Sequence, residues 1–185
     1  MIASIILAGG ESRRMGEPKL LLKHAGKTLL EQVIGIAKPL SERVVVVVGA
    51  YAELYRAEAL RCGAFVTEAE DWRAGQGASL RAGVRALPAG VSGCLVLLGD
   101  QPFVTPTHLK RLLSTAAGAS GELVFSAYDG AFGPPLYLGS NLFEKATKLE
   151  PRQNAKPLLS GDPVTVPLAD WQDIDTPEDA KRLLE

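Results

Sequence analysis

Short apolar runs alternate along this chain with longer segments in which apolar residues recur at helical spacing. The apolar runs are rich in β-branched residues and predict strands over residues 3–7, 43–48, 64–67, 94–98, 122–127 and 164–166. This alternation is typical of a mostly parallel sheet covered by helices. Residues 44–48 are five consecutive valines, so we expect this strand to be buried on both faces, in the interior of the sheet.

Signals for helix starts and stops lie between the predicted strands. The predicted helices cover residues 29–37, 52–62, 78–87, 106–117 and the segment that begins at 177. Thr28 and Glu31 have the spacing of a capping box at the first of these helices. Thr105 and Thr176 are each followed by proline, a pair that predicts the N-cap and the first position of a helix.

The segment from residue 128 to residue 135 interrupts this pattern. It carries Gly130, Gly133, Pro134 and Pro135, so we expect a shaped loop there rather than a helix or a strand. No internal repeat, low-complexity tract or linker occurs in the sequence. Residues 1–185 are therefore expected to form one domain.

Composition excludes several classes of protein. The 20 basic and 21 acidic residues nearly cancel, so the chain has no overall basic field for nucleic acid. Its apolar runs are much shorter than the roughly 18 residues that span a bilayer, and its first residues lack the basic region of a signal peptide. Cys62 and Cys94 have no metal-binding spacing. We therefore expect a cytoplasmic protein that binds neither nucleic acid nor membrane.

A glycine-rich turn with three cations follows the first predicted strand. Gly9 and Gly10 allow the backbone to turn sharply and to approach a ligand, with successive amide groups pointing into the turn. Arg13, Arg14 and Lys19 add positive charge, and ligands of open α/β sheets bind beyond the carboxyl ends of the strands. The run is neither a Walker loop nor a dinucleotide fingerprint, so the two glycines taken alone favour a solvated turn with surface cations.

The whole run resembles the signature L-A-[GA]-G-x-S-x-R-M-G-x-x-K of nucleotidyltransferases similar to molybdenum cofactor cytidylyltransferase and guanylyltransferase. Nine of its thirteen positions match. The resemblance continues through the whole chain, in the segments 18–22, 26–30, 72–79, 97–102, 128–135 and 173–179. It implies a three-layer α/β/α, Rossmann-like fold of the nucleotide-diphospho-sugar transferase type. Its sheet would be mixed and mostly parallel, with an antiparallel strand near residues 136–138.

The resemblance also assigns roles in binding a nucleoside triphosphate. The turn would hold the triphosphate through its backbone, which involves Leu7, Ala8, Gly9, Gly10, Glu11, Ser12 and Arg13. Arg14 would bind the departing pyrophosphate, and Lys19 would stabilise the charge that builds on the α-phosphate. The nucleoside would contact the start of the helix after residue 74, with Gly75, Gln76, Gly77 and Ser79 as candidates. Lys19, Arg14 and Asp100 are the residues that the resemblance places in catalysis.

Two aspartates are candidates for a magnesium site. Asp100 directly follows a buried strand, where a carboxylate is costly unless it is paired or bound to metal. Magnesium prefers a few carboxylates together with phosphate oxygens and water. The resemblance pairs Asp100 with Asp175. The alternative for Asp175 is helix capping, for which Thr176 is better placed.

The resemblance implies transfer of a nucleoside monophosphate to the phosphate of molybdopterin or molybdenum cofactor, with release of pyrophosphate. Leu7 to Gly10 read as in the guanylyl branch and Pro18 to Leu22 as in the cytidylyl branch. The later pattern Tyr128-x-Gly130-x-x-Gly133-x-Pro135 resembles the cytidylyl branch, so CTP is the preferred donor and GTP is the alternative. A sugar or polyol phosphate is the alternative acceptor, and a molybdoenzyme or cofactor-carrier protein is the expected protein partner. A dehydrogenase is the rival enzyme class, but it would need a third glycine. Outside the enzyme class, the rival is an inactive nucleotide-binding regulator. The reaction needs no imidazole base, so His24 and His108 are expected on helix or loop surfaces.

Overall fold

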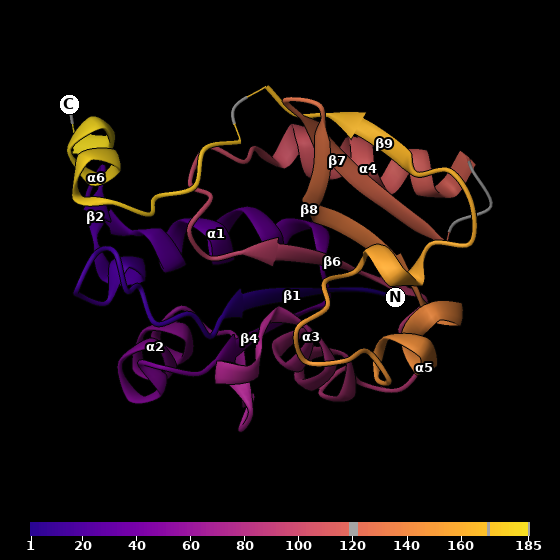
Figure 1. Ribbon diagram of the computed structural model, residues 1–185, viewed down its shortest axis with the longest axis horizontal. Coiled ribbons are helices and arrows are strands. Elements are labelled where there is room, and N and C mark those ends of the chain that lie inside the picture. Colours follow the sequence, from indigo (N-terminus) through magenta and orange to yellow (C-terminus); the bar gives the residue numbers. More distant parts are fainter. Residues whose placement is uncertain (119–121, 170, 185) are drawn as a thin grey trace.

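The computed structural model describes every residue of the chain except residues 119–121, 170 and 185. Its centre is a seven-stranded sheet with the strand order β5-β4-β1-β6-β8-β7-β9 (Figure 1). The strands are β1 (Ile2–Ala8), β4 (Arg43–Val48), β5 (Phe65–Glu68), β6 (Gly93–Leu98), β7 (Leu123–Tyr128), β8 (Ala131–Gly139) and β9 (Val164–Pro167). Only β8 runs antiparallel to its two neighbours, so the sheet is mixed and mostly parallel, as predicted.

Helices pack on both faces of this sheet, which gives the three layers that the sequence predicts (Figure 1). They are α1 (Leu29–Ala37), α2 (Ala52–Arg61), α3 (Gln76–Arg85), α4 (Pro106–Gly118) and α5 (Phe143–Ala146). The last helix, α6 (Pro177–Leu184), stands apart from the sheet, and its Ala180 packs with Leu29 of α1 (Figure 1). Alternate residues of β1 point to opposite faces: Ile6 packs with α1, α2 and α4, whereas Ile5 packs with α3 and α5. The five valines of β4 are all buried in the sheet interior, as predicted.

The helix caps explain where α1 and α6 begin. Thr28 Oγ1 accepts the backbone N–H of Glu31 at 3.0 Å, but the Glu31 side chain turns to Arg61, so only half of the predicted capping box forms. At α6 the box is complete, because Thr176 Oγ1 accepts from the Asp179 N–H and Asp179 Oδ2 accepts from the Thr176 N–H. Thr176 is therefore the cap, as predicted.

The prediction of a loop over residues 128–135 is wrong. The turn between β7 and β8 is confined to Asp129 and Gly130, both with positive φ, and β8 starts at Ala131. The two prolines fall where the β7–β8 register shifts, so the sheet does not need the N–H groups that they lack. Ser126 Oγ donates to the carbonyl of Pro135 there, and this contact between distant residues could not be foreseen from local composition.

Two smaller features were also not predicted from the sequence. Residues 23–28 form a short hairpin of β2 (Lys23–His24) and β3 (Lys27–Thr28). His108, for which a surface or helix-face role was expected, lies on the buried face of α4 with Nε2 2.7 Å from Ser126 Oγ, and this burial lowers the pKa of its imidazole. Within the described ranges, no helix combines the length and apolar character that a membrane crossing requires.

Candidate functional site

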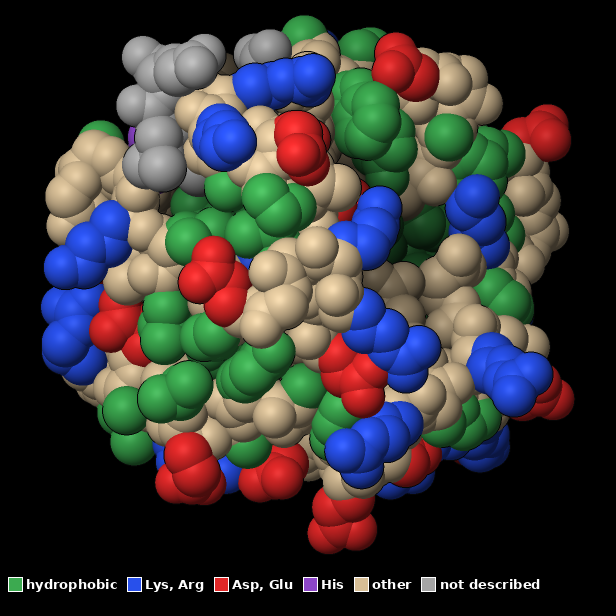
Figure 2. All heavy atoms as spheres, turned by 60° about the vertical axis from the view of Figure 1, so that its left-hand side comes forward, with side chains coloured by type: hydrophobic (Ala, Val, Ile, Leu, Met, Phe, Trp, Pro, Cys, Tyr) green, Lys and Arg blue, Asp and Glu red, His purple; other side chains and the backbone are tan. Residues whose placement is uncertain are grey.

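A cavity of about 520 Å³ opens where β1 and β6 end. These carboxyl ends lie at the left of Figure 1, and Figure 2 shows that side hollowed, with Lys and Arg side chains along the rim. Except for Gly77, every residue that the sequence assigns to the nucleotide or the metal lines the cavity: Leu7, Ala8, Gly9, Gly10, Glu11, Ser12, Arg13, Arg14, Lys19, Gly75, Gln76, Ser79, Asp100 and Asp175. The remaining lining residues are Leu20, Trp72, Arg73 and Leu98.

The glycine turn fits closely against its neighbours. A Cβ on Gly9 would lie 2.9 Å from Ser79 Oγ, and a Cβ on Gly49 would lie 2.6 Å from the Gly9 carbonyl oxygen. Side chains at these positions would push the turn into the cavity. The sequence indicated the importance of Gly9 but not that of Gly49, which acts from the end of β4.

Ser12 is the most unusual residue of the turn. Its φ is 51°, a left-handed conformation that is uncommon outside glycine, and its carbonyl accepts the N–H groups of both Met15 and Gly16 at 2.9 Å. Its hydroxyl is buried beneath the turn, within reach of the buried Tyr55 hydroxyl. The strained backbone of Ser12, rather than its hydroxyl, therefore shapes the cavity wall.

Lys19 connects the turn to the two aspartates. Its Nζ donates to Asp100 Oδ2 at 2.5 Å and to Asp175 Oδ1 at 2.6 Å, and only 10% of its side chain is exposed. Burial alone would lower the pKa of Lys19, but the two carboxylates outweigh burial and hold this pKa above its usual value. Arg14 Nη2 donates to the other oxygen of Asp175 at 2.5 Å. Two cations thus meet two carboxylates in what we call the Lys19 cluster (Arg14, Lys19, Asp100 and Asp175).

The chain brings the two aspartates together through its backbone. The Ile174 N–H donates to the Asp100 carbonyl at 3.0 Å, which fixes the segment before α6 against the end of β6. Behind them, Gln101 Nε2 donates to Asp173 Oδ1 at 2.8 Å. Burial, together with the charge of Asp100, raises the pKa of Asp173 to about 6. The sequence analysis assigned no role to Gln101. The only hint in the sequence was that Gln101 directly follows Asp100, the candidate metal ligand.

The start of α3 forms the opposite wall. Gly75 has a φ of 136°, and a Cβ there would lie 2.5 Å from the Pro151 carbonyl oxygen, so glycine is required. Gln76 and Ser79 reach the cavity, as expected of nucleotide-binding candidates. Gly77 does not line it, because its N–H donates to the Pro151 carbonyl and its Cα packs against residues 150–153.

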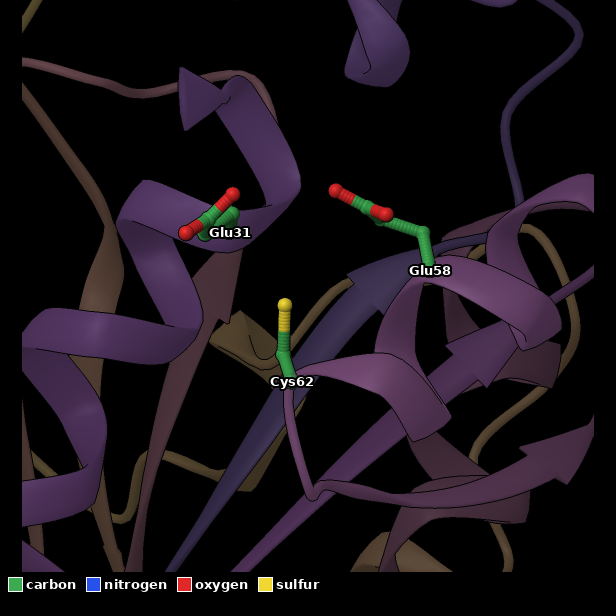
Figure 3. A group of neighbouring side chains, drawn as sticks. All are labelled: Glu31, Glu58 and Cys62. Carbon is green, nitrogen blue, oxygen red and sulfur yellow. The ribbon is translucent and has the colours of Figure 1, made fainter. Parts of the chain in front are cut away.

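A second group of acidic residues lies between α1 and α2 (Figure 3). Glu31, Glu58 and Cys62 each offer a ligand atom within 4.8 Å of the others, a spacing that could hold a metal ion. However, Arg61 Nη2 already donates to Glu31 at 2.7 Å and to Glu58 at 2.8 Å. Burial also raises the pKa of the Cys62 thiol, which disfavours the thiolate that a metal needs. We call these residues the Arg61 cluster, and it joins two helices rather than holding a metal.

Comparison with known proteins gives one family. The family described as the MobA-like NTP transferase domain matches residues 4–166. Purine catabolism protein PucB of Bacillus subtilis is 30% identical over 194 residues, which cover 96% of this chain and 93% of PucB.

Solved structures share the fold over nearly the whole chain. Rv0371c of Mycobacterium tuberculosis, in complex with manganese, superposes with a TM-score of 0.80 at 27% identity, over 99% of this chain and 97% of that one. Molybdopterin-guanine dinucleotide biosynthesis protein A of Archaeoglobus fulgidus superposes with a TM-score of 0.74 at 25% identity, over 99% and 96% of the two chains.

Proposed function

The chain belongs to the MobA-like NTP transferase family, and from this we propose that it transfers a nucleoside monophosphate from a nucleoside triphosphate to a phosphorylated small molecule. CTP is the preferred donor, and the phosphate of molybdopterin or molybdenum cofactor is the preferred acceptor. The observation that carries the proposal is the cavity, where a glycine turn, Lys19 and two aspartates meet. Residues 1–185 act as one transferase domain in this proposal.

Charge and backbone geometry support the donor site. A triphosphate carries several negative charges, and the cavity presents the cations of Arg13, Arg14 and Lys19 beside the amide groups of the glycine turn. Gln76 and Ser79 face the nucleoside from the start of α3.

The reaction is a displacement at the α-phosphorus. An oxygen of the acceptor phosphate forms a bond to that phosphorus, the bond from the α-phosphorus to the bridging oxygen breaks, and pyrophosphate leaves with the electron pair. Lys19, whose raised pKa keeps it protonated, stabilises the charge on the α-phosphate. Arg14 is placed farther out on the turn, where it can receive the pyrophosphate.

Asp100 and Asp175 fit a divalent cation. Their oxygens already converge on one positive centre, the Lys19 ammonium, so the two carboxylates can share a cation. Hard carboxylate oxygens are the ligands that magnesium prefers, and the manganese complex of Rv0371c supports a divalent metal in this fold. When bound, magnesium would neutralise charge on the phosphates. Lys19 would then exchange its carboxylate partners for the α-phosphate.

The choice of donor and acceptor is inferred from the sequence motifs and from one relative. The turn reads as in guanylyl enzymes and the segment 18–22 as in cytidylyl enzymes, while the Archaeoglobus relative is described as a molybdopterin-guanine dinucleotide protein. GTP is thus the alternative donor, and a sugar or polyol phosphate is the alternative acceptor. A molybdoenzyme or cofactor-carrier protein would receive the product. The free thiols of Cys62 and Cys94 agree with a cytoplasmic location.

A donor panel tests the proposal. Each of the four nucleoside triphosphates is incubated with magnesium and the protein, with and without molybdenum cofactor, and pyrophosphate release is measured. We expect release that depends on the cofactor and is fastest with CTP. An inactive regulator would bind nucleotide without releasing pyrophosphate, and absence of release with every donor and every phosphorylated acceptor would overturn the proposal.

A further inference from the structure

The glycine turn continues into a segment, residues 12–20, that carries both Arg14 and Lys19. The middle of this segment is mostly exposed to solvent. Its two ends are not, because Ser12 turns inward with a φ of 51° and Leu20 is only 4% exposed. The positions of the two cations therefore depend on how these two ends are held.

Tyr55 lies beneath both ends of the segment. It belongs to α2, its side chain is 1% exposed, and it packs in the same buried cluster as Leu20. Burial raises the pKa of its hydroxyl, whereas the Leu20 backbone N–H and the Ser12 hydroxyl oppose this rise because they face the phenol oxygen. One buried oxygen thus lies close to both ends of the segment.

These three polar groups adjoin one another but are imperfectly paired. Ser12 Oγ and Tyr55 Oη are both buried, and neither forms a well-aligned hydrogen bond with a described residue. In the described parts of the chain, no backbone carbonyl accepts the Leu20 N–H. Leaving such groups unpaired is costly, so a small shift of the segment that pairs them would be favourable.

On the cavity side, ion pairs hold the same segment. Arg14 and Lys19 both bind Asp175, and Lys19 also binds Asp100. In the proposed reaction Lys19 exchanges its carboxylates for the α-phosphate, so its ion pairs are lost as the triphosphate takes their place. The contacts with Tyr55 lie on the opposite side of the segment and are not affected by this exchange.

We propose that Tyr55 is a positioning residue for the transfer. Its oxygen accepts the Leu20 N–H, its O–H donates to Ser12 Oγ, and the segment held in this way keeps Lys19 directed at the α-phosphate. Tyr55 does not line the cavity, so it acts through the segment and touches no substrate. This inference rests on the proposed nucleotidyl transfer and goes further by naming the group that aligns its central cation.

The first test compares Tyr55→Phe with Tyr51→Phe in pyrophosphate release, with the donor and acceptor that support release by the parent. Tyr51 is the matched control, because it lies one turn earlier, its ring packs 5.6 Å from that of Tyr55, and it is only half-buried. A misplacement of about 1 Å can slow a reaction about 100-fold. We expect Tyr55→Phe to lower kcat at least about 10-fold and to change the nucleotide KM less than about 2-fold. Tyr51→Phe should match the parent.

Urea denaturation separates positioning from a merely structural role. Tyr55→Phe should unfold at the same urea concentration as the parent, since an apolar ring edge replaces an imperfectly paired hydroxyl. A lower unfolding midpoint with an unchanged kcat would show that the hydroxyl only stabilises the fold, and would overturn the inference.

A second readout does not depend on transfer. Hydrogen exchange of the Leu20 amide is followed by NMR for the full chain with magnesium and a non-hydrolysable CTP analogue. Exchange should be about 10-fold faster in Tyr55→Phe and unchanged in Tyr51→Phe. Ser12→Ala should also lower kcat, and the double variant should be no slower than Tyr55→Phe alone, because the two hydroxyls act as a pair.

The outcomes separate this inference from the proposed function. Pyrophosphate release by the parent, with an equal kcat for Tyr55→Phe, would overturn the inference and leave nucleotidyl transfer standing. Losses in the two single variants that multiply in the double variant would also overturn it, as would equal Leu20 exchange in the parent and Tyr55→Phe. Faster Leu20 exchange in Tyr55→Phe, without release by the parent for any donor and acceptor, would overturn the transferase and leave Tyr55 as the residue that holds the segment.

Discussion

One cation lies between two carboxylates at the centre of both the Lys19 cluster and the Arg61 cluster. Lys19 joins Asp100 and Asp175, and Arg61 joins Glu31 and Glu58. They differ in position: the Lys19 side chain is 10% exposed at the carboxyl ends of two strands, whereas the Arg61 side chain is 56% exposed on the outside of two helices.

The two cations differ as well. A guanidinium presents several fixed donors, and Arg61 uses Nε and Nη2 to hold Glu58 while Nη2 also reaches Glu31. An ammonium is a compact charge on a flexible stem, so Lys19 can move from the carboxylates to a phosphate. Closeness of carboxylates alone therefore does not make a reactive site. A cavity and an exchangeable cation are needed too.

The largest effect is expected from Lys19→Ala. Removing a cation that stabilises charge in the transition state should lower pyrophosphate release by about 100-fold or more. Arg61→Ala is the matched control, since it removes the central cation of the other cluster, and it should keep the parent rate. Circular dichroism checks that both variants are folded. A rate for Lys19→Ala close to that of the parent would show that the two clusters do not differ in function.

The next effect concerns metal affinity. Asp175→Asn removes a proposed ligand and should weaken manganese binding, measured by electron paramagnetic resonance, by at least about 10-fold. Glu31→Gln should bind manganese like the parent, because the Arg61 cluster holds no metal in our account. If only Glu31→Gln lost manganese binding, the metal site would have to be assigned to the Arg61 cluster instead.

A smaller effect is expected on stability. The hydrogen bonds from Arg61 hold the pKa of Glu58 below its usual value, against the opposite influence of burial. A lowered pKa in the folded state stabilises the protein above the unfolded pKa of about 4.3, and this contribution disappears as pH falls through the folded pKa.

Glu58→Gln should therefore lower the free energy of unfolding at pH 7 by about 1 kcal/mol or less, the usual range for such pairs. The difference from the parent should vanish in acid. Urea denaturation at several pH values between neutrality and pH 3 would measure it. A difference that stays constant with pH would mean that the charge of Glu58 is not responsible.

The smallest effect is expected from Arg61→Lys, which gives the second cluster the same central cation as the first, a lysine between two carboxylates. Without a cavity, this exchange should create no manganese binding, and it should leave pyrophosphate release unchanged. Isothermal titration with manganese is the measurement. New metal binding in this variant would show that residue type matters more than position.

The sequence predicted the centre of this fold well, for a physical reason. Strands buried on both faces are continuous apolar runs, so β1, β4 and β6 were visible from local composition, with bounds within one residue. The strand β8 was largely missed, because its prolines are accommodated by a register shift and by a hydrogen bond from Ser126. Such compensation comes from another strand, and local sequence carries no sign of it.

The candidate site was also predicted only where its residues are contiguous in the sequence. The glycine turn is contiguous, so its residues could be identified together, and all of them line the cavity. The pairing of Asp100 with Asp175 came only from resemblance, since these residues meet through a backbone contact of Ile174. The Arg61 cluster joins residues from two helices, and no local pattern in the sequence predicted it.

The most direct test of the central claim follows the fate of the α-phosphate. CTP radiolabelled at the α-phosphate is incubated with magnesium, molybdenum cofactor and the parent protein, Lys19→Ala or Arg61→Ala, and the products are separated. The account predicts label in the acceptor for the parent and for Arg61→Ala, and very little for Lys19→Ala. Label that remains in free nucleotide with the parent, or that reaches the acceptor equally well with Lys19→Ala, would contradict it.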